Sequence, residues 1–237
     1  GPPRLGLRRG AQTLLLRRAH GGVATALDLL EAVEEGRVAP DRWLEEAERA
    51  GCFDAVAAEG LAGRGLRPAV PVTPPEVWGA GVTYRRSADF REEGTGIYDR
   101  VYAAERPELF FKAAGWRVAG HDGPIRVRGD SGWNVPEPEL TLVVNARGEV
   151  AGFTAGNDVS SRDIEGENPL YLPQAKVYDG SCAIGPGILL AAPEDLLDID
   201  IEVVIVRAGR TVFEGGTRTS RMKRSFEELV SYLGRAL

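Results

Sequence analysis

Apolar residues alternate with polar or small ones on both sides of a short polar turn in the middle of the chain. The first run covers residues 140–144, the turn is Asn-Ala-Arg-Gly at 145–148, and the second run covers residues 149–156. Side chains two residues apart in a strand share a face, so alternation of this kind is typical of paired strands. The pattern therefore predicts a β-hairpin.

A helical periodicity marks the N-terminal part of the chain. Apolar residues at helical spacing predict one helix from residue 26 to about 35 and a second from about 41 to 50. Thr25, followed three residues later by Asp28, resembles a capping pair at the start of the first helix. Short strands are expected around Gly10, so this region is predicted to be a small α/β domain.

Gly and Pro are concentrated in residues 60–75, which makes this stretch the best linker in the chain. We therefore expect a small α/β domain over residues 1–70 and a larger domain over residues 71–237, with the boundary near Pro71. Further elements expected in the larger domain are strands at 109–111, 125–127, 187–191, 199–206 and 210–213, and a final helix capped by Ser225 and Glu228.

The composition is that of an ordinary globular protein, with 43% hydrophobic and 27% charged residues among 237. A net charge of −6 argues against nucleic acid as a partner. No apolar run approaches the length needed to cross a membrane. Cys52 and Cys182 make no disulfide framework and are read as small buried residues, which favours a reducing, cytoplasmic location.

Three carboxylates stand at the ends of the predicted hairpin. Glu137 and Glu139 share a strand face, and Asp158 joins that face if the hairpin loop has two or four residues. An odd loop would send Asp158 to the other face. Together they would form an all-oxygen site suited to Mg²⁺, before Mn²⁺ or Ca²⁺, and unsuited to Zn²⁺. The alternative is a solvated strand face, the usual reading of Glu-x-Glu.

Four motifs resemble the fumarylacetoacetate hydrolase superfamily in order and spacing. They are Glu-x-Glu-Leu at 137–140, Gly-Phe-Thr-Ala-Gly-Asn-Asp-Val-Ser-Ser-Arg-Asp at 152–163, Gln-Ala-Lys at 174–176 and Ala-Ile-Gly-Pro-Gly at 183–187. The resemblance covers most of the chain, from about Pro71. It implies an α+β, mainly β fold, with a β-barrel or roll as the catalytic domain. It also implies that Glu137, Glu139 and Asp158 bind Mg²⁺ and that Lys176 contacts substrate.

Two further stretches resemble the sugar-acid dehydratase branch of that superfamily: Pro-Glu-x-Phe-x-Lys at 107–112 and Glu-Asn-Pro-Leu-Tyr-Leu-Pro-Gln-Ala-Lys at 167–176. This resemblance implies dehydration of a 2-keto-3-deoxy sugar acid, such as 2-keto-3-deoxy-D-arabinonate to 2-oxoglutarate semialdehyde. Lys176 and Glu108 are the expected catalytic groups, and Lys112, Tyr84 and Ser87 the expected substrate contacts. The resemblance also suggests a homodimer or homotetramer.

Two other functions stay open. The first is metal-dependent C–C hydrolysis of an acylpyruvate or 2,4-diketo acid, with water activated by Glu92 or Glu93. Hydrolases of the superfamily tend to carry a histidine just after the turn at Tyr84. Here the only histidines are His20 and His121, which counts against this function. The second is a non-catalytic protein that binds a metal or ligand.

Two segments bear on how complete the site is. Residues 85–100 are polar and are expected to form either a lid over the substrate or a plain surface loop. Relatives of this family continue beyond the point that corresponds to Leu237, so the C-terminal end of the catalytic domain is expected to be missing from this chain.

Overall fold

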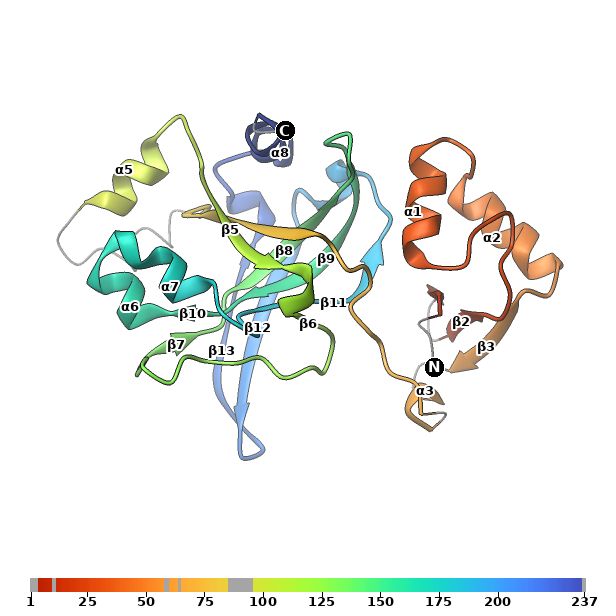
Figure 1. Ribbon diagram of the computed structural model, residues 1–237, viewed down its shortest axis with the longest axis horizontal. Coiled ribbons are helices and arrows are strands. Elements are labelled where there is room, and N and C mark those ends of the chain that lie inside the picture. Colours follow the sequence, from red (N-terminus) through yellow and green to blue (C-terminus); the bar gives the residue numbers. More distant parts are fainter. Residues whose placement is uncertain (1–3, 10–11, 58–59, 64, 85–95, 236–237) are drawn as a thin grey trace. The chain divides into compact units, whose positions relative to one another are not determined.

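The structure is a computed structural model that describes residues 4–9, 12–57, 60–63, 65–84 and 96–235 (Figure 1). The chain divides into two compact units, Gly1–Val72 and Thr73–Leu237, and the expected boundary near Pro71 lies beside this division. Among the described residues, no helix has the length and apolar character required to span a membrane.

The first unit joins a small sheet to helices. Its elements are β1 (Gly6–Arg9), β2 (Gln12–Leu16), α1 (Ala26–Glu34), α2 (Pro40–Arg49), β3 (Phe53–Ala57) and α3 (Gly60–Gly63), and the antiparallel sheet has the order β1-β2-β3. The predicted capping pair is confirmed, because the Thr25 side chain accepts from Asp28 N and the Asp28 carboxylate accepts from Thr25 N. Trp43 and Cys52 are buried in the core that the helices share with the sheet.

The second unit is mostly sheet. Its elements are β4 (Glu76–Gly81), α5 (Ile97–Ala103), β5 (Glu108–Ala114), β6 (Val118–Ala119), β7 (Asn134–Val135), β8 (Pro138–Val144), β9 (Val150–Asp158), β10 (Ser160–Ser161), α6 (Arg162–Glu167), α7 (Leu172–Lys176), β11 (Cys182–Leu189), β12 (Asp200–Arg207), β13 (Arg210–Arg218) and α8 (Phe226–Gly234). The largest sheet has the order β6-β11-β9-β8, and β4-β5, β7-β10 and β12-β13 form separate pairs. Figure 1 shows β12 and β13 as a long hairpin.

Three expectations differ from this architecture. Over the described residues these sheets do not close into a barrel, so a mixed fold that is mostly sheet is observed and the closed barrel is not. Residues 125–127 are irregular rather than a strand. The strand expected at 187–191 is the end of a longer strand, β11, which already begins at Cys182. The helix at the C-terminus is confirmed, with Ser225 accepting a hydrogen bond from Glu228 N.

The predicted hairpin is confirmed as β8 and β9, but its loop is neither of the two lengths considered. Asn145 N donates to Glu149 O at 2.9 Å, so the loop between this pair holds three residues. Gly148, at φ 77°, supplies the left-handed residue that such a loop needs. Taken alone, an odd loop would turn Asp158 to the other face of the sheet.

A β-bulge restores the face. Val144 pairs with Val150, whereas Val143 pairs with Gly152, so Ala151 is an extra residue on β9. Beyond the bulge the register continues unchanged to the pair Pro138 and Asn157. The odd loop and the bulge therefore cancel, and the ends of both strands reach the register that a two-residue loop would have produced.

Candidate active site

The ends of β8 and β9 bring two of the predicted carboxylates together. Asp158 N donates to Glu137 O at 2.9 Å, so the two residues lie directly opposite each other. Glu139 pairs with Gly156, two residues further along each strand. A Cβ at Gly156 would meet the Cβ of Glu139. Glu137, Glu139 and Asp158 thus start from one face of the sheet, as the sequence predicted.

Lys176, the last residue of α7, places its ammonium group between these carboxylates. Its Nζ lies 2.6 Å from Glu137 Oε2 and 2.9 Å from Asp158 Oδ2, and it donates to Ser160 Oγ at 2.7 Å. The side chain is buried, with a relative exposure of 2% for the residue. Two carboxylate oxygens therefore converge on a single positive charge at the floor of the candidate site.

Arg162 opens α6 and contacts the same cluster from its other side. Its Nη2 pairs with Glu137 Oε1 and its Nη1 pairs with Glu165 Oε2, one helical turn further on. Both Arg162 and Glu165 are largely withdrawn from solvent. The two oxygens of Glu137 are thus divided between Arg162 and Lys176, which fixes the orientation of this carboxylate.

Strand β5 supplies a third side of the site. Glu108 and Phe110 lie two residues apart in unbroken register with β4 and so share one face. A bulge follows at Lys112, because Trp78 pairs with Phe111 and Val77 pairs with Ala113. The Lys176 Nζ lies 5.4 Å from the centre of the Phe110 ring, within the range of a cation–π contact. The same face therefore brings Glu108 to the side of the strand where Lys176 lies.

Two glycines on β4 make room for these side chains. Gly81 pairs with Glu108 and Gly79 with Phe110. A Cβ at Gly81 would overlap the Glu108 carboxylate, and one at Gly79 would overlap the Phe110 ring. The Gly79-x-Gly81 motif lies within the strand rather than in a turn, and its lack of side chains lets Glu108 and Phe110 lie flat across β4.

We predict that Gly81→Ala will lower the activity of the site without unfolding the protein. The added methyl group would push the Glu108 carboxylate aside, and a small displacement of a reacting group can cost about 10²-fold in rate. Turnover and thermal unfolding would be compared with Gly187→Ala, where the added Cβ meets nothing within 4 Å. Equal turnover in the two variants would contradict a role for the Glu108 position.

Lys112 differs from its expected role as a substrate contact. Its residue exposure is 2%, and its Nζ lies 2.6 Å from Asp158 Oδ1, with Val159 O and Lys176 O as further acceptors. Burial lowers the pKa of Lys112, and the charge of Asp158 opposes that shift. Its ammonium group is directed to protein acceptors beneath the site.

Of the other two expected substrate contacts, the structure describes Tyr84 but not Ser87. Tyr84 follows β4, and burial, followed by the charge of Glu139, raises the pKa of its hydroxyl to about 12. Tyr84 therefore stays protonated beside Glu139 and can donate a hydrogen bond at neutral pH. Ser87, Glu92 and Glu93 lie outside the described residues, as does most of the proposed lid, whereas its last residues, 97–100, belong to α5.

The donor set fits Mg²⁺ in its chemistry, although the side chains are paired with cationic groups of the protein. Among the side chains that the structure describes, no three of His, Cys, Asp or Glu form a group that could hold a metal ion as they stand. Oxygens of Glu137 and Asp158 nevertheless converge on one cation, the Lys176 ammonium, and Glu139 starts from the same face. An oxygen-only set of this kind is what a hard divalent cation requires.

Comparison with known proteins assigns the second unit to a family. The family model described as fumarylacetoacetate (FAA) hydrolase C-terminal matches residues 76–237, the whole of the mostly β unit apart from its first residues. The chain belongs to the fumarylacetoacetate hydrolase family. The resemblance drawn from the sequence motifs is thereby confirmed.

Within this family, the similar relatives are sugar-acid dehydratases. A probable 2-keto-3-deoxyxylonate dehydratase of Haloferax volcanii is 45% identical over 99% of this chain and 81% of its own length. A 2-dehydro-3-deoxy-D-arabinonate dehydratase of Saccharolobus solfataricus is 47% identical over 71% of this chain and 59% of its own length.

Solved structures of this fumarylacetoacetate hydrolase branch show the same fold. The apo form of a 2-keto-3-deoxy-D-arabinonate dehydratase has a TM-score of 0.75 at 38% identity. A 2-keto-3-deoxy-D-arabinonate dehydratase complexed with magnesium and 2,5-dioxopentanoate has a TM-score of 0.74 at 37% identity. In both comparisons the match covers 94% of this chain and 74% of the other.

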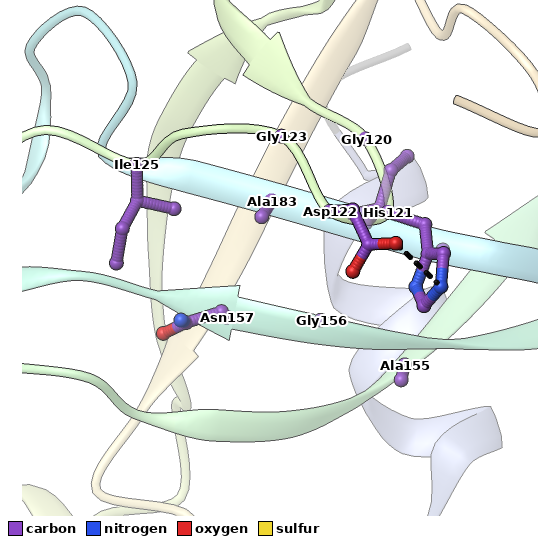
Figure 2. A pocket seen from close by; sticks show the side chains of 11 residues that line it. Gly120, His121, Asp122, Gly123, Ile125, Ala155, Gly156, Asn157 and Ala183 are labelled. Carbon is purple, nitrogen blue, oxygen red and sulfur yellow. Dashed lines mark ion pairs between the residues drawn. The ribbon is translucent and has the colours of Figure 1, made fainter. Parts of the chain in front are cut away.

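Neither histidine is among the contacts of the carboxylate cluster described above. His20 belongs to the first unit, and His121 is on a loop with its side chain 43% exposed beside Asp122. A cavity of about 350 Å³ lies against this loop (Figure 2). Its lining includes Ala155, Asn157 and Ala183, which alternate along the strands with Asp158 and Cys182 and so project from the other face of the sheet.

Both cysteines are buried thiols, as the sequence predicted. Burial raises the pKa of Cys182 to about 11, so its thiol is protonated and is no nucleophile at neutral pH.

The raised pKa of Cys182 predicts a loss of stability in base. The native state holds this proton more tightly than the unfolded chain, so the free energy of unfolding will fall as the pH rises from about 9 towards 11. Two pKa units correspond to about 2–3 kcal/mol. Urea unfolding at pH 8, 9.5 and 10.5 should show a steeper fall for the wild type than for Cys182→Ala. Parallel curves would contradict the shift.

Sequence reasoning missed the roles of Ser160, Arg162, Glu165 and Phe110. Ser160 and Arg162 belong to the very run that carries the family resemblance, in which only Asp158 was given a role. Phe110 was part of the quoted Pro-Glu-x-Phe-x-Lys stretch, and its spacing from Glu108 placed both on one face. The motifs therefore contained most of these residues, but they did not show which side chain each residue contacts.

Proposed function

We propose that this protein is a Mg²⁺-dependent hydro-lyase that removes water from a 2-keto-3-deoxy sugar acid, such as 2-keto-3-deoxy-D-arabinonate. The observation that carries the proposal is the convergence of Glu137, Asp158 and Ser160 on the buried Lys176 ammonium. The dehydratase relatives, one of them complexed with magnesium, support the same reaction class.

Glu137, Glu139 and Asp158 are the proposed Mg²⁺ ligands. Mg²⁺ bound there would supply Lewis-acid polarisation of the 2-keto oxygen, which makes the C3 proton easier to remove. Arg162 holds Glu137 in place through the carboxylate oxygen that Lys176 does not contact. Tyr84, whose hydroxyl stays protonated near Glu139, is the proposed hydrogen-bond donor to the substrate.

Lys176 and Glu108 are the proposed acid–base groups. One takes the C3 proton, and the other protonates the C4 hydroxyl, which leaves as water with the C–O bonding electrons. The double bond formed between C3 and C4 then shifts to C4–C5 by proton transfer, and the resulting enol becomes the C5 aldehyde. The sum of these steps is the loss of one water and the formation of 2-oxoglutarate semialdehyde.

The test is an assay of the protein with Mg²⁺ and 2-keto-3-deoxy-D-arabinonate, with the semialdehyde as the measured product. Product that requires Mg²⁺ and disappears in Glu137→Ala would support the proposal. Pyruvate released from acylpyruvates, with no dehydration of sugar acids, would instead support C–C hydrolysis. That reaction is disfavoured because the chain has no histidine just after Tyr84, where hydrolases of the superfamily tend to carry one.

The oligomeric state is a separate proposal. We expect a homodimer or homotetramer, and light scattering during size-exclusion chromatography would distinguish these from a monomer of 25.5 kDa. A monomer at micromolar concentration would overturn this expectation without affecting the proposed reaction.

A further inference from the structure

Lys112 carries a buried charge that the proposed reaction does not use. It lies at the bulge of β5 with a residue exposure of 2%, and its ammonium group contacts Lys176 O. A buried ammonium must be hydrogen-bonded to offset the loss of its hydration. The identity of its acceptors therefore indicates what it does.

Three protein oxygens surround the Lys112 ammonium. It donates hydrogen bonds to Lys176 O at 2.6 Å and to Val159 O at 3.0 Å, and it forms an ion pair with Asp158 Oδ1 at 2.6 Å. These acceptors come from the end of β9, from the residue that follows it and from the end of α7. One side chain thus links the two elements that carry the site to β5.

The contact with Asp158 divides the two oxygens of that carboxylate. Oδ1 is held by Lys112 from below, and Oδ2 faces Lys176 at 2.9 Å. A carboxylate held at one oxygen cannot rotate freely, so Oδ2 keeps its direction toward the site. Asp158 thereby enters the site as a one-oxygen donor.

The contact with Lys176 O fixes the origin of the second functional side chain. Lys176 is the last residue of the short helix α7, whose final carbonyl groups lack helical partners. Lys112 Nζ and Ser181 Oγ both donate to this carbonyl, the latter at 2.7 Å. The backbone position from which the Lys176 side chain starts is therefore set by two donors.

From this geometry we infer that Lys112 is a positioning residue: its ammonium group aims Asp158 Oδ2 at the metal position and anchors the backbone of Lys176. Its buried ammonium group faces oxygens of the protein, so it acts through these two residues. The inference rests on the proposed function for the identity of the metal ligand, and it adds a residue to that site.

Lys112→Met separates positioning from simple charge balance. Methionine matches the length of the lysine stem and needs no buried hydrogen bonds, and Asp158 keeps Lys176 as a charged partner, so the fold should survive the change. Loss of a positive charge beside Asp158 would, by Coulomb attraction alone, tighten Mg²⁺ binding. Loss of an outer partner that orients a ligand instead weakens binding or activity by about 10–100-fold. The two explanations predict opposite signs.

The experiment measures Mg²⁺ binding alone by calorimetry, together with kcat, KM and the melting temperature. We expect Lys112→Met to bind Mg²⁺ at least about 10-fold more weakly, with a fall in kcat rather than a rise in KM. Lys223→Met is the matched control, because Lys223 is exposed and contacts Tyr102. It should behave as the wild type does.

Mg²⁺ affinity in Lys112→Met that equals or exceeds that of the wild type would overturn the inference, whatever the activity. If that variant does not fold, Lys112→Arg decides, because its charge is retained while its planar guanidinium cannot reach the same three acceptors. Wild-type affinity in Lys112→Arg would then overturn the inference, and weaker binding would support it.

Failure of the proposed function would be recognised separately. A wild-type protein that binds Mg²⁺ but dehydrates no sugar acid would overturn the reaction, while the calorimetric comparison would still decide the role of Lys112. A wild-type protein that binds no Mg²⁺ would overturn both.

Discussion

Replacing Lys176 by methionine will lower turnover of the sugar acid by about 10²–10⁴-fold, the usual contribution of a general acid–base group. The same change removes the ammonium that separates Glu137 from Asp158. We expect roughly 1–3 kcal/mol less stability without Mg²⁺, since the buried carboxylates lose a donor. The loss stays below that of an unpaired buried charge because Arg162 and Lys112 remain.

Mg²⁺ should reverse the loss of stability but not the loss of turnover. The cation would replace the missing positive charge between the carboxylates, and a ligand that binds the folded state stabilises it by mass action. Thermal unfolding with and without Mg²⁺, and initial rates at saturating Mg²⁺, check both effects. Turnover in Lys176→Met within tenfold of the wild type would exclude Lys176 from proton transfer, and Lys223→Met controls for the substitution itself.

Replacing Asp158 by asparagine is expected to have the largest effect on Mg²⁺ binding and on stability. Loss of a residue that only orients a metal ligand weakens metal binding by up to about 100-fold. Loss of a charged ligand itself should therefore weaken Mg²⁺ binding by at least about 100-fold. Two buried ammonium groups, those of Lys112 and Lys176, lose their shared partner. Breaking a buried pair from one side costs about 3–5 kcal/mol, so the melting temperature should fall strongly.

Calorimetry with Mg²⁺ and chemical denaturation would test Asp158→Asn. The matched control is Asp179→Asn, which makes the same change in an exposed carboxylate paired with Arg117. Exposed pairs contribute about 0–1 kcal/mol, so this control should stay near the wild type in stability and in Mg²⁺ binding. Wild-type Mg²⁺ affinity in Asp158→Asn would remove Asp158 from the proposed ligand set.

The register of the central hairpin shows how a correct prediction can rest on an incomplete reason. Alternation along residues 140–156 was enough to predict two paired strands, but it placed Asp158 on the face of Glu137 only for a loop of two or four residues. The structure instead combines a three-residue loop with a bulge at Ala151, and the two together give the shared face. A bulge leaves little trace in the pattern, because the small residues Ala151 and Gly152 fit either face.

Lys112 shows the opposite case, in which the residue was singled out but its role differed. Its place in the Pro-Glu-x-Phe-x-Lys stretch suggested a substrate contact. Its burial and its acceptors on Asp158, Val159 and Lys176 depend on chain segments 46 or more residues away, and no local pattern reports them. The pairing of Arg162 with Glu137 was hidden for the same reason.

The sequence alone determined the features that short-range rules control: the strands of the hairpin, the capped helices α1 and α8, and the order of motifs that assigns the chain to its family. Alternation, helical spacing and caps act over a few residues, so they can be read without knowing the fold. Only the tertiary structure decided the open sheets and the partners of Lys112, Lys176 and Arg162. Those partners depend on strand register and on how distant segments pack together. A shift of the register by one residue would bring different side chains into contact.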